Sequence, residues 1–351
     1  MSAVTVRIMH PEPAADAGPL VQWVAAERGR LARRHVISFE AAGAADVAIV
    51  SGPADALSFG ARLRALVRAD RPAGLVVLGS GAIPLATGGD LRDLVAVAGA
   101  EERVALANNR YSADVVAIAR AWPDPAEVPD LPSDNALPRW LQEEAGYDVR
   151  DLRRRWRLAI DIDGPLDLVL LGADPGDDVD LGRVRTAIDA VRRTAGEPGA
   201  ELFVAGRTSA ATLSWLERSA AARTRALIEE RGLRTSAAGQ RPPASVLGAL
   251  LERDGPESLG AHLRRFGDAA ILDTRVLLAH RLGADESAWP AAEDRFASDL
   301  LLGEGIADPW LRALTMSAAA APIPILLGGH TLVGPGVRLV VSGRQRGPRW
   351  R

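Results

Sequence analysis

The sequence predicts an α/β protein in two parts, a mostly parallel sheet sandwiched by helices followed by a second α/β region of unknown type. Short apolar runs rich in β-branched residues alternate with alanine-rich helical stretches, which is the pattern of α/β folds. The run 74–79 (GLVVLG) carries no polar side chain, as expected of a parallel strand that is buried on both faces. With 351 residues, 48% of them apolar, the chain is long enough for two hydrophobic cores.

In the first half, runs of alternating or continuous apolar residues predict strands at 4–9, 46–50, 74–79, 115–119 and 157–162. Apolar residues repeating at helical spacing predict helices at 19–34, 58–69, 90–98, 137–145 and 166–171. In the segment 58–69, for example, the apolar residues that share one helical face are Phe59, Leu63, Leu66 and Val67. The alternation by itself therefore predicts an α/β domain.

The segment 173–180 (ADPGDDVD) is acidic and has no apolar period, so it is interpreted as a linker. The predicted domains are 1–172 and 181–342, followed by a basic tail at 343–351. In the second domain we expect helices at 181–194 and 210–219, several more helices up to 282, and strands at 201–205, 226–230, 233–234, 269–272, 323–327 and 337–341. A loop is expected at 235–243, and the segment 328–331 (GGHT) could bind a ligand but is interpreted first as a hairpin or loop between the two closing strands.

Two absences in the composition exclude whole classes of enzyme. The chain has no cysteine, which removes disulfides, thiolate nucleophiles and cysteine-ligated metal centres. It also has no lysine, so all 42 basic residues are arginine, and neither a Walker lysine nor a lysine Schiff base is possible.

The charge and hydropathy of the chain bear on its partners and its location. A net charge of −3 gives no general attraction for nucleic acid or for an anionic membrane. The arginine-rich segment 150–157 is interpreted as a solvated helix face rather than a nucleic-acid site. Residues 1–10 do not have the pattern of a signal peptide, and no apolar run is long enough for a membrane span. We therefore expect a cytoplasmic protein with a small-molecule ligand.

Three aspartates, Asp161, Asp163 and Asp167, lie where a predicted strand runs into a helix. Carboxylates in such a position suit a magnesium ion that is shared with a phosphate group. They also suit a helix N-terminus, with Asp163 as the cap and Asp167 in the first turn. The residues alone leave both interpretations open.

The run that contains these aspartates resembles a motif of a known family. The sequence from Asp161 to Leu168, DIDGPLDL, resembles the Asp-Ile-Asp-Thr-Pro-Glu-Asp-Leu motif of nucleotidyltransferases with the nucleotide-diphosphosugar transferase fold. These include the guanylyltransferases of molybdenum-cofactor and phospholactate biosynthesis. The segment 78–85 (LGSGAIPL) is similar to the strand end at which these enzymes hold a metal ion, with Ser80 beside it. The resemblance covers roughly residues 1–175 and implies a magnesium ion held by Asp161 and Asp163.

The sequence also departs from that family. Ala82 stands where the family has its metal-binding aspartate. The segment 10–19 (HPEPAADAGP) is acidic where the family has a glycine-rich loop that cradles a triphosphate. Acidic side chains there repel phosphate, and the chain has no lysine to replace the usual phosphate contact.

Two polar turns are further candidate sites. The segment 107–114 brings together side chains that could hold a base, a sugar or a phosphate, namely Asn108, Asn109, Arg110, Tyr111, Ser112 and Asp114. A loop that caps itself through its own amides is the alternative. The turn 206–209, with Arg207, Thr208 and Ser209, lies between a strand and a helix and favours an anion, or is a plain helix cap. Residues 273–275 (DTR) are likewise a helix cap or a site.

Three functions are compatible with these features. The first is a nucleotide- or phosphorylated-metabolite-binding protein that carries out magnesium-dependent nucleotidyl transfer in cofactor biosynthesis, with Arg110 neutralising the developing charge. The second is a non-catalytic binding or regulatory module that kept the fold and lost the triphosphate loop. The third places the chemistry around residues 207–209.

Overall fold

The computed structural model describes residues 3–53, 57–120, 127–229 and 242–343, and these form two compact units. Unit 1 contains residues 1–17 and 25–162, and unit 2 contains residues 18–24 and 163–351. The division falls between Ile162 and Asp163, before the acidic segment 173–180. The reason is the helix that follows, whose apolar side chains Leu166 and Leu170 are part of the core of unit 2. None of the described helices is long and apolar enough to cross a membrane.

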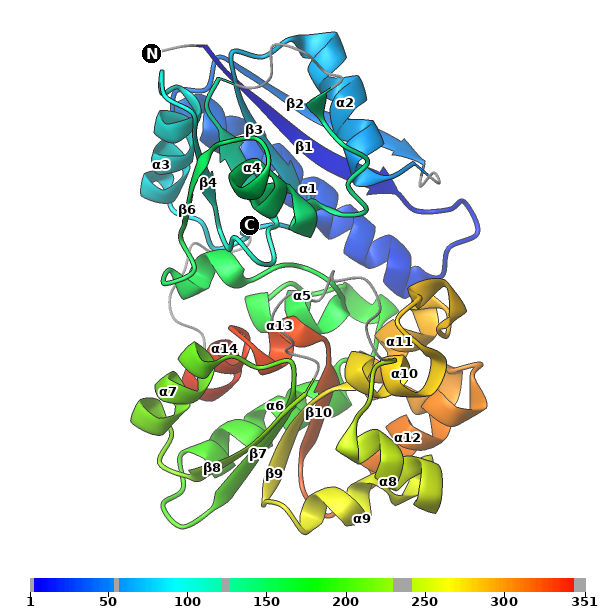
Figure 1. Cartoon of the computed structure of the whole chain (residues 1–351). Coiled ribbons are helices and arrows are strands. Elements are labelled where there is room, and N and C mark those ends of the chain that lie inside the picture. Colours follow the sequence, from blue (N-terminus) through cyan, green and yellow to red (C-terminus); the bar gives the residue numbers. More distant parts are fainter. Residues whose placement is uncertain (1–2, 54–56, 121–126, 230–241, 344–351) are drawn as a thin grey trace. The chain divides into compact units, whose positions relative to one another are not determined.

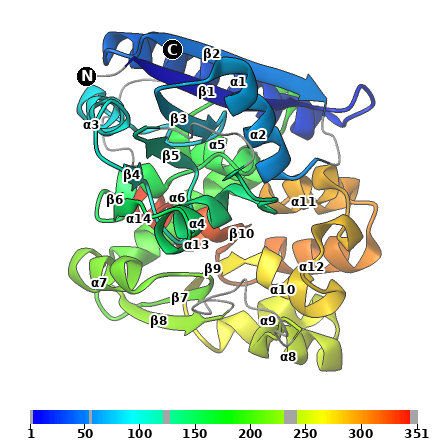
Figure 2. The same ribbon diagram turned by 45° about the horizontal axis from the view of Figure 1, so that its top comes forward.

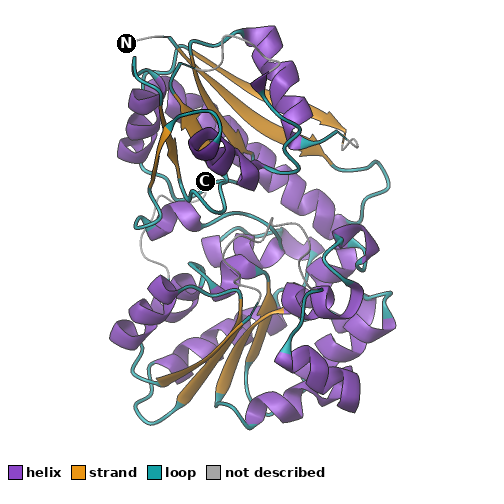
Figure 3. Ribbon diagram, viewed as in Figure 1, coloured by secondary structure: helices purple, strands orange, loops and turns teal. Residues whose placement is uncertain are grey.

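Unit 1 contains one six-stranded sheet with helices on both faces (Figures 1 and 3). Its strands are β1 (Val4–Glu12), β2 (Asp46–Pro53), β3 (Gly74–Gly79), β4 (Val104–Ala107), β5 (Val115–Ile118) and β6 (Asp148–Asp151). Its helices are α1 (Pro19–Ala41, whose first residues belong to unit 2), α2 (Phe59–Asp70), α3 (Gly88–Ala98) and α4 (Leu137–Glu143). The strand order is β2-β1-β3-β5-β4-β6, which Figure 2 shows from β2 to β6.

The sheet of unit 1 is mixed, because β5 runs antiparallel to both β3 and β4. The connection between β4 and β5 spans only residues 108–114, which is too short for the crossover that a parallel pair needs. Alternate residues of each strand face opposite layers. Thus Leu75 and Val77 pack with α2 and α4, while Val76 and Leu78 pack with α1 and α3.

The structure corrects two predictions in unit 1. Residues 157–162 are not a strand, since a short 3-10 helix occupies Trp156–Ala159 and only Asp161 forms a β-bridge. The arginine-rich segment 150–157 is not a helix face either, because it begins within strand β6 and continues through a turn. Strands β4 and β6 were not predicted.

Unit 2 is built on a four-stranded, wholly parallel sheet of order β10-β9-β7-β8. The strands are β7 (Glu201–Gly206), β8 (Arg223–Ile228), β9 (Ala269–Asp273) and β10 (Ile325–Gly328). The helices are α5 (Pro165–Leu171), α6 (Gly182–Ala195), α7 (Ala210–Ser219), α8 (Val246–Asp254), α9 (Leu259–Arg264), α10 (Thr274–Leu282), α11 (Ala292–Asp299), α12 (Pro309–Ala319), α13 (His330–Val333) and α14 (Val337–Ser342). One hydrophobic core joins the sheet to these helices.

The predicted closing strand 337–341 is wrong, because these residues form helix α14. Val337 and Val340, three positions apart, are both fully buried, and that spacing places them on one helical face. The segment 328–331 is likewise not a hairpin loop, since α13 begins at His330. The predicted run 233–234, most of the loop 235–243 and the basic tail beyond 343 lie outside the described residues.

Candidate functional site

A pocket in unit 1 lies where the carboxyl ends of β1 and β3 separate. From β1 the chain continues to β2, which lies on one side of β1, and then to β3, which lies on the other side of β1. Such a switch point is the usual ligand site of an open α/β sheet. A cavity of about 230 Å³ is present here, and it is lined by Met9, Pro11, Arg28, Phe59, Arg62, Val77, Leu78, Gly79, Ser80, Gly81, Ala82, Ala113, Asp114, Val115, Val116, Asp134 and Asp161.

The turn that follows β3 forms one wall of the pocket, and side chains of α1 hold it. The ring of His35 donates from Nε2 to the carbonyl oxygen of Ala82 at 3.0 Å, and Arg34 donates to the carbonyl of Pro84 at 2.6 Å. Burial lowers the pKa of His35 to about 4, so the ring is neutral at neutral pH. Ile83 adopts a φ of +47°, a strained conformation for a β-branched residue. Strain of this kind persists only where surrounding contacts fix the backbone, and it is typical of functional sites.

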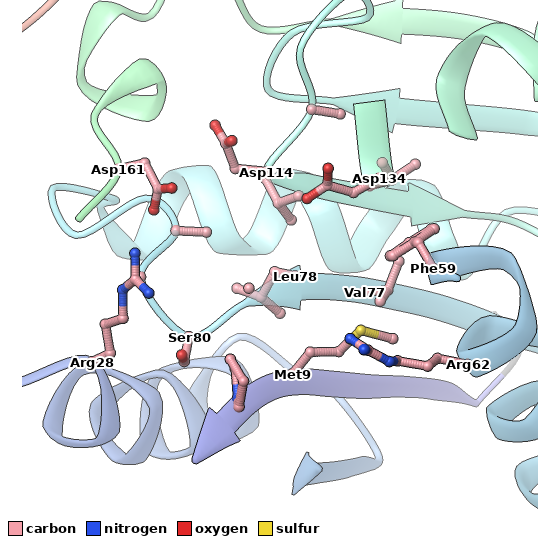
Figure 4. A pocket seen from close by; sticks show the side chains of 17 residues that line it. Met9, Arg28, Phe59, Arg62, Val77, Leu78, Ser80, Asp114, Asp134 and Asp161 are labelled. Carbon is pink, nitrogen blue, oxygen red and sulfur yellow. The ribbon is translucent and has the colours of Figure 1, made fainter. Parts of the chain in front are cut away.

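The pocket has two charged ends and an apolar middle (Figure 4). Arg28 lies with Asp161 at one end, and its Nε donates to the carbonyl of Ile162 at 2.6 Å. Arg62 lies at the other end, near Phe59. Asp114 and Asp134 also line the pocket. Together with Asp161 they set three carboxylates against two guanidinium groups, so the net charge of the lining does not favour binding of a polyanion.

Ser80 adds a hydroxyl to the lining, and its partner is a histidine that the sequence did not single out. The Oγ of Ser80 lies 3.0 Å from Nδ1 of His10. Burial, together with the charge of Arg28, lowers the pKa of His10, which keeps this ring neutral and able to accept the serine proton in a hydrogen bond.

The two segments of the family resemblance meet at this pocket. Ala82 and Asp161 form an antiparallel β-bridge, and the N–H of Ile162 donates to the carbonyl of Gly81 at 3.1 Å. Asp161 therefore has an alanine beside it where a second carboxylate would complete a metal site. Among the described residues no group of three His, Asp or Glu side chains is arranged to hold a metal ion. Magnesium can be held by one or two carboxylates together with substrate phosphates, so the magnesium site that the resemblance implies stays a prediction.

The polar loop 108–114 mostly binds itself. The Oδ1 of Asn108 accepts from the N–H of Asp114 at 3.0 Å, and its Nδ2 donates to the Asp114 carboxylate at 2.7 Å. The ring of Tyr111, which is 56% exposed, has the guanidinium of Arg110 5.2 Å from its centroid. Asn109 Oδ1 accepts from the N–H of Tyr111 at 3.1 Å. Of the six residues predicted here, the loop brings Asp114 to the lining of the pocket, whereas Asn108, Asn109, Arg110, Tyr111 and Ser112 are not part of it.

The remaining predicted site residues lie in unit 2. Asp167 accepts hydrogen bonds from the N–H groups of Asp163 and Gly164, both at 2.9 Å, and so caps its own helix α5. Asp163 pairs with His330 across 3.4 Å and lies in the unit that does not contain Asp161.

The turn that follows β7 holds the other three predicted residues of this unit. Ser209 caps α7 through the N–H of Thr212, and Thr208 is buried. Arg207 binds Asp273, a partner that sequence reasoning left open as a helix cap.

Sequence reasoning missed several of the residues that the structure gathers. Arg28 and Arg62 lie on helices whose periodicity marks them only as solvent-facing positions, and no local signal reveals the pocket that they line. The resemblance at 78–85 is the signal that pointed to Ser80, whereas Asp273 was left open as a helix cap or a site.

Comparison with known proteins gives no assignment. No protein-family model matches the chain, and no curated protein matches its sequence.

Proposed function

We propose that unit 1 binds a nucleotide or another phosphorylated metabolite in the pocket at the ends of β1 and β3, as a nucleotidyltransferase-like protein of cofactor biosynthesis. The observation that carries the proposal is the pairing of Ala82 with Asp161. It joins the two segments that resemble motifs of the guanylyltransferases, and it does so at the rim of a cavity on a switch point of the sheet.

The chemistry of the pocket supports a nucleoside moiety as the bound part. Its apolar middle suits the face of a base, and the carboxylates of Asp114 and Asp134 can accept hydrogen bonds from amino or hydroxyl groups. Arg28 and Arg62 supply donors for a phosphate group at either end. At about 230 Å³ the cavity is smaller than the roughly 300–1,000 Å³ of drug-sized ligand sites, which favours one nucleoside over a dinucleotide.

A non-catalytic binding module is the second candidate, and Ala82 favours it. Nucleotidyl transfer in the resembled family depends on a metal ion, and here Asp161 lacks the second carboxylate that would share it. We therefore assign no chemical step to a metal. In both candidates the same residues bind the nucleoside, and they differ in whether a bond is broken.

The binding proposal is tested by thermal-shift titration of the full chain with nucleosides, nucleoside mono- and triphosphates and sugar nucleotides, with and without Mg²⁺. Binding stabilises the folded chain by RT ln(1 + L/Kd), where L is the free ligand concentration, so the melting temperature rises with the logarithm of ligand concentration above Kd. Asp114→Asn and Arg62→Gln should reduce the shift, because each removes a charged group from the lining. Asp148→Asn is the matched control, since this exposed aspartate of the same unit forms an ion pair with the exposed Arg150 and lies outside the pocket.

The outcomes separate the candidates. If no nucleoside or nucleotide stabilises the chain, the proposal is refuted. Stabilisation that Asp114→Asn weakens and Asp148→Asn leaves unchanged supports a nucleotide site in unit 1. Release of pyrophosphate from a bound triphosphate then indicates transfer, whereas binding without release identifies the non-catalytic module.

A further inference from the structure

The carboxyl edge of the parallel sheet in unit 2 holds a second concentration of charged side chains. The order β10-β9-β7-β8 places the switch point between β9 and β7, because β7 is followed by β8 on one side and β9 by β10 on the other. At this point Arg207 follows β7 and Asp273 ends β9. The strands themselves are apolar, so the polar side chains begin where the strands end.

Two buried ion pairs form the base of this edge. The guanidinium of Arg207 donates from Nε and Nη2 to the two carboxylate oxygens of Asp273, at 2.7 and 3.1 Å. Arg275 donates to both oxygens of Asp299, with Nη2 at 2.6 Å, and its Nη1 also reaches Thr274. In both pairs the carboxylate is buried, whereas the guanidinium of Arg207 keeps part of its surface exposed.

The backbone is shaped to bring these pairs together. Gly206 has a φ of +128°, and a Cβ there would lie 2.2 Å from the Cβ of Asp273. Gly329 follows β10, and a Cβ placed on it would lie 4.0 Å from Nε of Arg275. The hydroxyl of Thr331, in α13, is buried and has no hydrogen-bond partner in the described part of the chain, a condition that a bound ligand or water relieves.

Three groups at this edge are accessible. The side chain of Arg207 is 31% exposed, that of His330 35% and that of Asp163 40%. Asp163 is itself an oxyanion that pairs with His330, and its charge helps to raise the pKa of both Arg207 and Arg275. Although burial lowers the pKa of each guanidinium, their aspartate partners raise it further, so both remain cationic. Arg207 and His330 are thus the accessible hydrogen-bond donors of this edge, and a ligand oxyanion would displace Asp163 from His330.

We propose that this edge is a second small-molecule site of the chain, and that it takes a ligand with an oxyanion group, phosphate or carboxylate, which Arg207 and His330 contact. Asp273 fixes the guanidinium plane of Arg207 for that contact. Asp163 competes with the ligand for the same cations. The site consists of residues of unit 2 alone and does not depend on the nucleotide pocket of unit 1.

The test is NMR of the histidine rings during separate titrations with inorganic phosphate and with acetate, at constant ionic strength. The His330 signal is assigned by its loss in His330→Gln, and His262 and His280 serve as internal references, because His10 and His35 contact the lining of the unit 1 pocket. We expect a saturable shift at His330 and none at His262 or His280. A response to phosphate alone indicates a phosphorylated ligand, and a response to acetate alone indicates a carboxylate.

Two variants separate a ligand site from a structural network. Arg207→Lys keeps the charge but loses the planar fork, so it should weaken binding about tenfold or more, whereas Arg253→Lys, at the exposed Arg253–Asp254 pair, should not change it. Asp163→Asn removes the competing charge and should strengthen binding by roughly threefold to fivefold. The proposal is overturned if His330 shifts no more than His262 and His280 with both anions, or if Arg207→Lys binds as the native chain does.

Discussion

Asp167 makes the stability of unit 2 depend on pH in the direction opposite to most aspartates. Burial, and then the charge of Asp163, raise the pKa of this carboxyl from 3.8 to about 8. The folded protein therefore holds a proton there that the unfolded chain releases above pH 4. Unfolding therefore releases a proton at any pH between 3.8 and 8. The stability that the protonated Asp167 contributes is fully present below pH 3.8 and is lost as the pH rises through 8.

The magnitude follows from the pKa difference. Each unit corresponds to about 1.4 kcal/mol, so between pH 5 and pH 8 the native chain should lose about 3–4 kcal/mol relative to a variant that cannot ionise. Asp167→Asn is that variant, because its amide oxygen can accept the two backbone hydrogen bonds that Oδ2 now accepts. Urea denaturation of both proteins at several pH values measures the difference, in which the other titrating groups cancel.

A control shows whether the effect belongs to the buried acid. Asp294 also lies buried in unit 2 and accepts two backbone N–H groups, one on each oxygen. Asp294→Asn should lower stability at every pH, because an amide can accept only one of these bonds in the same way. A stability difference between the native chain and Asp167→Asn that stays constant within about 1 kcal/mol from pH 5 to 8 would refute the reasoning.

Three further predictions concern buried or constrained residues. Burial lowers the pKa of His35 from 6.5 to about 4, so the free energy of unfolding of unit 1 should fall by about 3 kcal/mol as the pH drops from 6.5 to 4. Urea denaturation should show this loss, and His35→Gln should abolish it. Gly206→Ala should destabilise the chain by more than Gly43→Ala in thermal unfolding, because both have positive φ (+128° and +99°) but only the first Cβ meets another atom. Arg275→Met should cost about 3–5 kcal/mol by leaving Asp299 buried and unpaired, and adding Asp299→Leu should recover most of that loss in urea denaturation.

The candidate sites show where sequence reasoning reaches its limit. The resemblance at 78–85 and at 161–168 gave Ser80 and Asp161, and both line the pocket. It did not give Arg28 or Arg62, because their positions on α1 and α2 carry no local mark of a ligand. The magnesium site that it implied at Asp161 and Asp163, which lie on either side of the division between the units, stays a prediction.

The sequence by itself determined the α/β class, most helices and the strongly apolar strands. Helical periodicity, caps such as Ser58 and Ser209, and continuous apolar runs are all contained within about a dozen residues, so they can be recognised locally. The helix predicted at 210–219 matches α7 (Ala210–Ser219) for this reason.

Only the tertiary structure decided which segments pair. Strands β4 and β6 are four residues each and exist through hydrogen bonds to one another, and Val337–Ser342 forms a helix because its valines fit the core of unit 2. The bridge between Ala82 and Asp161 and the ion pair between Arg207 and Asp273 join residues more than sixty positions apart. The free energy of such contacts depends on partners that a local stretch of sequence does not contain, and both candidate sites are made of them.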